Sequence, residues 1–243
     1  MANEYIYPDI NDQITLSLIN KTELIAGSWE QDELSILAWI KEKLSHLDPD
    51  KAVLLDGGCG DGRLLPHFHS FFKKIYAIDP DSNRLSKAAE TSRKLGIEEK
   101  VVFINAALEE CEFELQFDVI ISSHIIQHVQ RHLVDKILSG CFKHLKPGGY
   151  LFLMTSYSTK SADYYVKDYF AENNFVEEEI SPELFDSMVS NSEGILPVHF
   201  FSRQSLVELF QNNFLVITYM QIFHNTKNNP NGRDIFVAAE KPI

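Results

Sequence analysis

Short apolar runs alternate with stretches of helical spacing through the middle of the chain, and this alternation restricts the possible folds more than any other feature. The stretches with helical spacing are 64–72, 84–95 and 133–145. Strands that alternate with crossover helices are typical of a parallel sheet, and almost continuous apolar runs indicate strands covered on both faces. The predicted strands of this sheet are 52–55, 75–78, 101–104, 119–121 and 150–154.

The last third of the chain predicts a different strand arrangement. Two further apolar runs, 214–223 and 234–239, are joined by a polar stretch that is rich in turn-forming residues. A short connection of this kind favours an antiparallel hairpin. Before it, Ser202 is expected to cap a helix. The sequence therefore predicts an α/β fold with a doubly wound, mostly parallel seven-stranded sheet that ends in an antiparallel C-terminal hairpin.

Two segments interrupt the alternation and predict structure added to the sheet. Residues 1–48 include amphipathic helical spacing and are expected to form an N-terminal helical cap, which leaves 49–243 as the main domain. Residues 157–201 are rich in aromatic and acidic side chains. A long insertion after the fifth strand is more typical of a functional cover than of an unstructured loop, so we expect a helical and aromatic lid there.

Charge and cysteine content restrict the partners and the compartment. The 22 lysines and arginines and 35 acidic residues give a net charge of −13, which disfavours duplex nucleic acid and anionic membranes as partners. The three cysteines form no C-x-x-C pair, so neither a disulfide framework nor a zinc knuckle is supported. The N-terminus lacks the features of a signal peptide, and no apolar run is long enough to span a bilayer. These features predict a soluble, cytoplasmic protein.

A glycine-rich turn and one acid point to a nucleoside ligand. The run VLLDGGCGDGR at 53–63 leads from a strand into a helix through Gly58, Gly60 and Gly62. Glycine allows positive φ and a close approach of ligand to backbone, and Gly58 and Gly60 are the candidates for that approach. The second strand ends in Asp79, where an acid can bind ribose hydroxyls. No G-K-[ST] follows, which disfavours a P-loop. The three glycines are closer together than those of the G-x-G-x-x-G motif in Rossmann dehydrogenases, which are the alternative class of nucleoside-binding enzyme.

Four motifs in order resemble one known family. The glycine turn, Asp79, the run FDVI at 117–120 and the run LKPGGYL at 145–151 are similar to motifs of the class I methyltransferases that use S-adenosylmethionine. The resemblance covers about residues 50–156 and, more loosely, the terminal hairpin. It implies a Rossmann-like methyltransferase fold, S-adenosylmethionine as cofactor, and methyl transfer to an acceptor.

The resemblance also implies roles for individual residues. Gly58 and Gly60 would allow the methionine moiety of the cofactor to lie against the main chain. Asp56 would anchor the turn or contact the amino group of that moiety. Asp79 would hold the ribose, with Pro80 beside the adenine. The residues implied in cofactor binding are Asp56, Gly57, Gly58, Gly60, Asp79, Pro80, Ala107, Leu108 and Ser122.

The adenine position departs from the family pattern. The family often has an acid after the third strand that meets the adenine amino group, but here Ala107 stands in that place. The adenine would then be held by main chain, by Leu108, or by Asn105 or Glu109 after a shift in register.

Three histidines are candidate bases or substrate-positioning residues. His124 and His128 follow the fourth strand and would share one face if a helix begins there. His199 closes the insertion. Histidine titrates near neutrality and so can act as a base. For His128 the alternative is a packing residue that lines the cofactor, and for His199 an aromatic element of the lid. No third ligand or H-E-x-x-H motif accompanies the pair, so no metal is expected.

The leading hypothesis is methyl transfer to oxygen or nitrogen of a small metabolite, a natural product or a short peptide. The motif Asn-Pro-Pro-Tyr, which the family's enzymes for nucleobase or glutamine amino groups carry after strand four, is absent. The alternatives are a protein or tRNA methyltransferase, or a non-catalytic partner subunit that keeps the methyltransferase fold. The sequence leaves the substrate, the accepting atom and the oligomeric state open.

Overall fold

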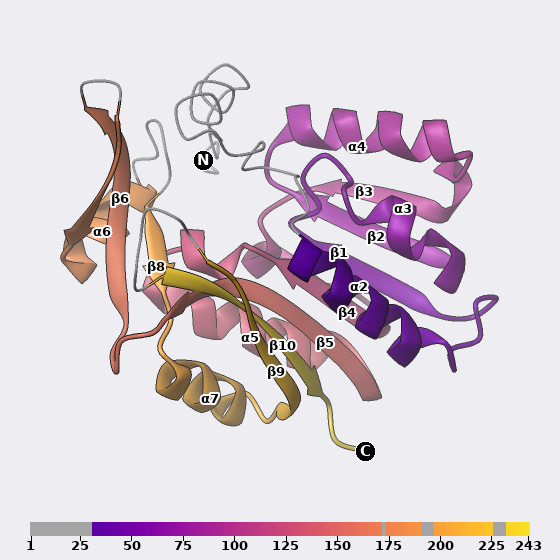
Figure 1. Ribbon diagram of the computed structural model, residues 1–243. Coiled ribbons are helices and arrows are strands. Elements are labelled where there is room, and N and C mark those ends of the chain that lie inside the picture. Colours follow the sequence, from indigo (N-terminus) through magenta and orange to yellow (C-terminus); the bar gives the residue numbers. More distant parts are fainter. Residues whose placement is uncertain (1–30, 172–173, 191–196, 226–231) are drawn as a thin grey trace.

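The structure, a computed structural model, describes residues 31–171, 174–190, 197–225 and 232–243 (Figure 1). Its larger sheet has seven strands in the order β3-β2-β1-β4-β5-β10-β9. The first five strands pair in parallel, whereas β10 is antiparallel to both β5 and β9. These strands are β1 (Val53–Gly57), β2 (Lys74–Asp79), β3 (Val101–Asn105), β4 (Phe117–Ser123), β5 (Leu145–Ser158), β9 (Val216–Asn225) and β10 (Gly232–Glu240). The predicted mostly parallel sheet with an antiparallel C-terminal hairpin is confirmed.

Helices cover both faces of this sheet, as the apolar strands require. One face is covered by α2 (Gln31–Leu44), α3 (Leu65–Phe68) and α4 (Ser82–Leu95), and the other by α5 (Arg131–His144) and α7 (Arg203–Asn212). Ser202 caps α7 through its side chain, which accepts a hydrogen bond from the backbone N–H of Ser205, as predicted. Single 3-10 turns complete the connections: η1 (His69–Phe71), η2 (Glu98–Lys100), η3 (Leu108–Glu110) and η4 (Ile126–His128).

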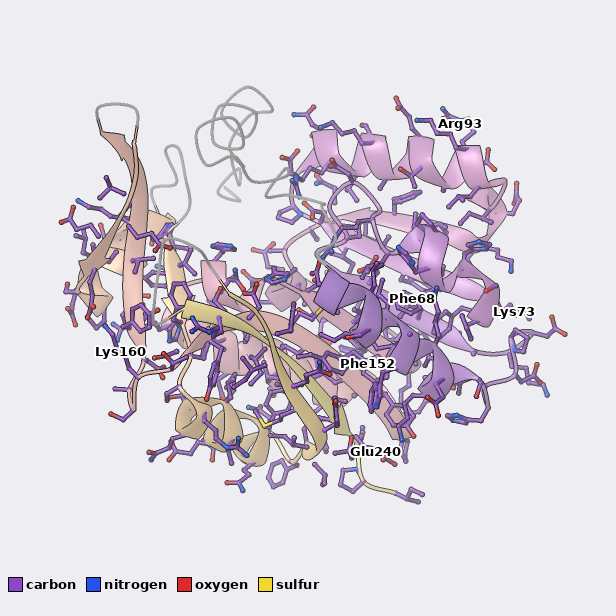
Figure 2. The ribbon with its side chains drawn as sticks, in the orientation of Figure 1. Phe68, Lys73, Arg93, Phe152, Lys160 and Glu240 are labelled. Carbon is purple, nitrogen blue, oxygen red and sulfur yellow. The ribbon has the colours of Figure 1, made fainter. Side chains whose placement is uncertain are left out.

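Large aromatic residues fill the layer between α2, α3 and the sheet. Phe68 and Phe152 are fully buried there, whereas Lys73 and Arg93 are exposed at the outer surface (Figure 2). Trp39 of α2 stacks on Tyr219 of β9, with ring centroids 4.7 Å apart. Helix α2 is therefore packed on the core of the sheet. Residues 1–30 of the expected cap lie outside the described residues, and the division at residue 48 stays a prediction.

The insertion after β5 contains a second sheet. Its strands, in the order β7-β6-β8, are antiparallel: β6 (Tyr164–Ala171), β7 (Asn174–Ile180) and β8 (Val198–Phe200). One helix, α6 (Pro182–Ser190), lies beside β6 at the edge of the molecule (Figure 1). Side chains alternate between the faces, so Tyr164 stacks on Phe200 on one face while Tyr165 packs on Phe185 of α6 on the other. The insertion thus contains the expected helix and buried aromatic pairs, but it also contains a three-stranded sheet that was not predicted, and its role as a lid stays a prediction.

Candidate active site

The glycine turn after β1 is packed tightly by side chains of the chain itself. Gly58 has φ +72° and Gly60 has φ +52°, a region in which other residues are strained. A Cβ on Gly58 would lie 1.5 Å from the side chain of Ile125, and one on Gly60 would lie 2.8 Å from the guanidinium of Arg84. The turn therefore requires glycine for its backbone and for these contacts.

Asp79, at the end of β2, holds this turn in place. Its Oδ2 accepts a hydrogen bond from the backbone N–H of Gly60 (2.9 Å) and its Oδ1 accepts one from the N–H of Asp81 (2.9 Å). Burial, with only 6% of the residue exposed, raises the pKa of Asp79, and the two N–H groups oppose that shift. A carboxylate accepts about four hydrogen bonds, so Asp79 keeps capacity for a ligand.

Asp56 is a buried carboxylate that lacks a hydrogen-bond partner in the described part of the chain. The residue is 1% exposed, and neither of its carboxylate oxygens accepts a hydrogen bond from a described residue. Burial raises the pKa of Asp56 to about 7, Arg63 opposes this shift, and Asp79 adds to it. A buried charge is costly unless it is paired. The Oγ of Ser122, on the neighbouring strand opposite Gly57, is also buried without a partner. Both groups suit a polar ligand, and the carboxylate suits a cationic one.

The side of the turn where an adenine is expected is lined mainly by apolar groups and main chain. The side-chain amide of Asn105 donates to the carbonyls of Asp79 (3.2 Å) and Pro80 (2.8 Å), so its N–H groups are used within the chain. A Cβ on Gly57 would lie 2.8 Å from Leu108, which closes against the turn. The carbonyl of Ala107 accepts from Cys111. The amide of Asn105 is thus engaged within the chain and Leu108 lies against the turn, while the group that holds the adenine stays a prediction.

The two histidines after β4 do not share a helix face. His124 has φ +57° and its backbone N–H donates to the carbonyl of Met154 (2.8 Å), and η4 follows as one 3-10 turn. Gln127 joins the two rings instead. Its Oε1 lies 3.2 Å from His124 Nδ1, and its Nε2 lies 3.2 Å from His128 Nε2.

The backbone at Ser156 fixes the direction of these bonds. Its N–H donates to Gln127 Oε1 (2.8 Å), so this oxygen is an acceptor and His124 Nδ1 must be the donor. The lone pair of neutral His124 is then on Nε2. That atom lies 3.8 Å from Oε1 of Glu33, a buried residue of α2.

Glu33 and Gln127 are site residues that sequence reasoning missed. Glu33 precedes Ile36, Leu37 and Ile40 by three, four and seven residues, the spacing of one helix face. An acid on the apolar face of α2 is the signal that could have found it. Gln127 had no such signal.

His124 has the properties of an accessible base. Its side chain is 27% exposed. Burial lowers the pKa of His124, but Glu33 and Asp234 of β10 outweigh burial and the opposing effect of Arg63, so the pKa lies above its ordinary value.

His128 has a different environment. Its Nδ1 lies 3.0 Å from the carbonyl of Pro197 in the insertion, so both ring nitrogens have partners. Burial lowers the pKa of His128 to about 4. A ring that stays neutral and is bonded on both sides favours the packing alternative over a role as base.

His199 belongs to a separate group of residues. Its Nε2 lies 2.8 Å from Oδ2 of Asp163, and its ring lies 3.7 Å from the ring of Phe201. Burial lowers the pKa of His199 and Asp163 opposes that shift. The structure brings His124 and His128 together through Gln127, but the hydrogen bond of His199 runs to Asp163 instead. Its role as base stays a prediction.

The Asp163 carboxylate is hydrogen-bonded to His199 of the insertion and to two serines that follow the insertion. We therefore expect Asp163→Asn to destabilise the fold. The carboxylate also accepts from the N–H of Ser202 (2.8 Å) and the hydroxyl of Ser205 (2.6 Å). Burial raises the pKa of Asp163, but these hydrogen bonds and the contact with His199 outweigh burial and lower the pKa to about 2. The carboxylate therefore adds about 2–3 kcal/mol of stability above pH 4, which is lost as the pH falls toward 2.

Urea unfolding at pH 7 and pH 3 measures this effect. Asp163→Asn should lower the free energy of unfolding by about 2–3 kcal/mol at pH 7, with a narrower difference at pH 3. The exposed control Asp50→Asn should stay within about 0.5 kcal/mol of the wild type. A difference that is the same at both pH values would contradict the role of the charge.

Within the described ranges, no group of three or more His, Cys, Asp or Glu side chains could hold a metal ion. Helices long and apolar enough to cross a bilayer are also absent from those ranges.

Comparison with known proteins relates the chain to methyltransferases. A family described as "Methyltransferase domain" matches residues 28–218. The ubiquinone biosynthesis O-methyltransferase of Rickettsia typhi is 29% identical over 164 residues, which cover 60% of this chain and 65% of the relative. The protein of the same name from Rickettsia conorii is 29% identical over 121 residues, which cover 50% of this chain and 40% of the relative. The chain thus spans less than two thirds of the length of either relative.

Solved structures share the fold. The 1,6-didemethyltoxoflavin-N1-methyltransferase of Burkholderia thailandensis, bound to S-adenosylhomocysteine, has a TM-score of 0.63 at 16% identity and covers 88% of this chain and 80% of its own. An S-adenosylmethionine-dependent methyltransferase of Clostridium acetobutylicum has a TM-score of 0.64 at 15% identity. The match covers 95% of this chain and 97% of the other. With the family match over most of the chain, the resemblance seen in the motifs is confirmed, and the chain belongs to the class I methyltransferase family.

Proposed function

We propose that this protein transfers a methyl group from S-adenosylmethionine to an oxygen or nitrogen atom of a small acceptor. The observation that carries the proposal is the pair of buried carboxylates, Asp56 and Asp79, on either side of the glycine turn. Asp56 has no hydrogen-bond partner among the residues that the structure describes, and a cationic ligand would stabilise it. The name of the Rickettsia relatives, an O-methyltransferase, supports oxygen as the accepting atom.

Each predicted cofactor residue has a place in this proposal. Asp79 would hold the ribose hydroxyls while its carboxylate keeps the bond to the turn, and Asp56 would hold the amino group. Main chain at Gly57, Gly58 and Gly60 would hold the methionine moiety, and Ser122, opposite Gly57, would contribute its hydroxyl. Pro80, Ala107 and Leu108 would hold the adenine.

When bound, S-adenosylmethionine supplies an electrophilic methyl carbon, and the electron pair of the broken carbon–sulfur bond stays on sulfur. The chain's own task is to orient the acceptor and to remove its proton. His124 is suited to this task because its Nε2 carries a lone pair and its ring is accessible. The acceptor's O–H or N–H bond breaks as the proton passes to Nε2, and the electron pair that remains forms the new bond to the methyl carbon.

The acceptor is proposed to have an apolar part and to lie beside the insertion. The insertion is rich in aromatic side chains, among them the stacked pair Tyr164 and Phe200, and small-molecule pockets are generally lined by apolar and aromatic groups. The net charge of −13 disfavours duplex nucleic acid as a substrate. The cysteines Cys59, Cys111 and Cys141 are free thiols, which supports a reducing, cytoplasmic location.

Calorimetric titration with S-adenosylhomocysteine tests the proposal directly. We expect a dissociation constant in the micromolar range. A companion assay follows transfer of labelled methyl from S-adenosylmethionine to phenols, catechols, carboxylic acids and amines. Failure to bind either form of the cofactor would refute the proposal and favour a non-catalytic partner subunit.

A further inference from the structure

Glu33 is a buried acid that joins the first described helix to the end of β4. It is 6% exposed, and its Oε1 lies 3.5 Å from Nη1 of Arg63 and 3.8 Å from Nε2 of His124. One carboxylate oxygen thus faces both a permanent cation and a titratable ring. No motif in the sequence assigns a role to this residue.

The pairing with Arg63 compensates for the burial of the Glu33 carboxylate. A buried carboxylate needs a cation or several donors to remain charged. Arg63 also donates to the hydroxyl of Ser123 (2.9 Å), which fixes the guanidinium at the carboxyl end of β4. The carboxylate of Glu33, 3.8 Å from His124 Nε2, therefore favours the charged form of the ring.

The position of the proton on His124 decides what that charge does. Nδ1–H is engaged by Gln127, so an incoming proton binds to Nε2, the nitrogen that faces Glu33. The other charged groups around the ring are Arg63 from the glycine turn, Asp234 from β10 and the neutral His128 from η4. Arg63 disfavours the imidazolium, and the two carboxylates favour it.

We infer that Glu33 is a positioning residue that orients His124 and stabilises the imidazolium formed when Nε2 takes the acceptor's proton. This inference rests on the proposed function, because it names the partner of the proposed base. It makes α2 part of the active site, since the helix supplies a group that the strand ends lack. Loss of the carboxylate should make His124 a weaker base without changing the cofactor-binding residues.

A titration of His124 tests this inference without an acceptor. Protein labelled with ¹³C-histidine is followed by NMR across pH 5–9, and the His124 signal is assigned by its absence in His124→Asn. In Glu33→Gln we expect the midpoint of His124 to move to lower pH by about half a pH unit or more, because an opposite charge favours the charged ring.

Two further variants control this experiment. Glu42→Gln removes an exposed acid of the same helix and should leave the midpoint unchanged. Glu33→Asp keeps the charge and should restore the midpoint toward that of the wild type. An unchanged midpoint in folded Glu33→Gln would overturn the inference, as would a shift of the same size in Glu42→Gln.

Failure of this inference is distinguishable from failure of the proposed function. Glu33→Gln should bind S-adenosylhomocysteine within about twofold of the wild type. With an acceptor from the methyl-transfer assay, its kcat should fall, and the acid limb of its pH profile should move to lower pH. Absence of cofactor binding in the wild type would remove the proposed function, whereas the His124 midpoint would still report whether Glu33 acts on the ring.

Discussion

Replacing His124 with asparagine is expected to lower kcat by about 10²–10⁴-fold, the usual contribution of a general base. Asparagine is the suitable replacement because His124 has φ +57°, and asparagine tolerates this conformation better than most residues. Binding of S-adenosylhomocysteine should stay within about twofold, since every predicted cofactor residue except Ser122 lies outside β4 and the segment that follows it. Initial rates with the acceptor from the labelled-methyl assay, together with calorimetry, measure both effects.

The pH dependence gives an independent check on His124. As the proposed base, His124 must be neutral to accept a proton, and Glu33 and Asp234 raise the pKa of His124 despite its burial. The wild-type kcat should therefore rise with pH, with a midpoint above the ordinary histidine value of about 6.5. His132→Asn, a change in an exposed histidine of α5, should leave the rate and its profile unaltered. Full activity in His124→Asn would show that orientation alone drives the transfer, or that another base such as His199 acts.

Replacing Asp79 with alanine is expected to weaken binding of S-adenosylhomocysteine by about 10–150-fold. The estimate corresponds to about 1.5–3 kcal/mol for the loss of hydrogen bonds to the ribose hydroxyls. The change also removes the acceptor for the N–H of Gly60, so the glycine turn loses its anchor on β2. Calorimetry on the wild type and the variant measures the difference.

Asp81 provides the matched control for Asp79. It lies two residues away and caps α4 by accepting from the N–H groups of Asn83 and Arg84. Asparagine is also a good capping residue, so Asp81→Asn should preserve both α4 and the affinity. Equal affinities for Asp79→Ala and the wild type would place the ribose elsewhere.

The fold was accessible from the sequence because its strongest signals are local. The strand runs, the glycine turn and the cap at Ser202 each depend on neighbouring residues, and all are present in the structure. The second sheet was not predicted because its aromatic content is equally compatible with helices and with strands. The alternation of Tyr164 and Tyr165 between two faces spans too few residues to be distinctive.

Only part of the site could be predicted from the sequence, because some of its contacts join residues that are distant along the chain. Asp56, Asp79 and the glycines follow one another along the chain in a recognisable order. The contact of Glu33 with His124, and that of Asp163 with Ser205, join residues far apart in sequence, and only folding brings them together. Local periodicity cannot specify such pairs, although the position of Glu33 on the apolar face of α2 was a usable signal.

The hydrogen bonds around Gln127 have one direction from end to end. His124 donates to Gln127, Gln127 donates to His128, and His128 donates to the carbonyl of Pro197. Reversing any one of these donors would force the next to reverse as well. The carbonyl oxygen of Pro197, in the insertion, thereby helps to determine which ring nitrogen of His124 carries the lone pair. The insertion can thus influence the tautomer of His124 through two intervening side chains, His128 and Gln127.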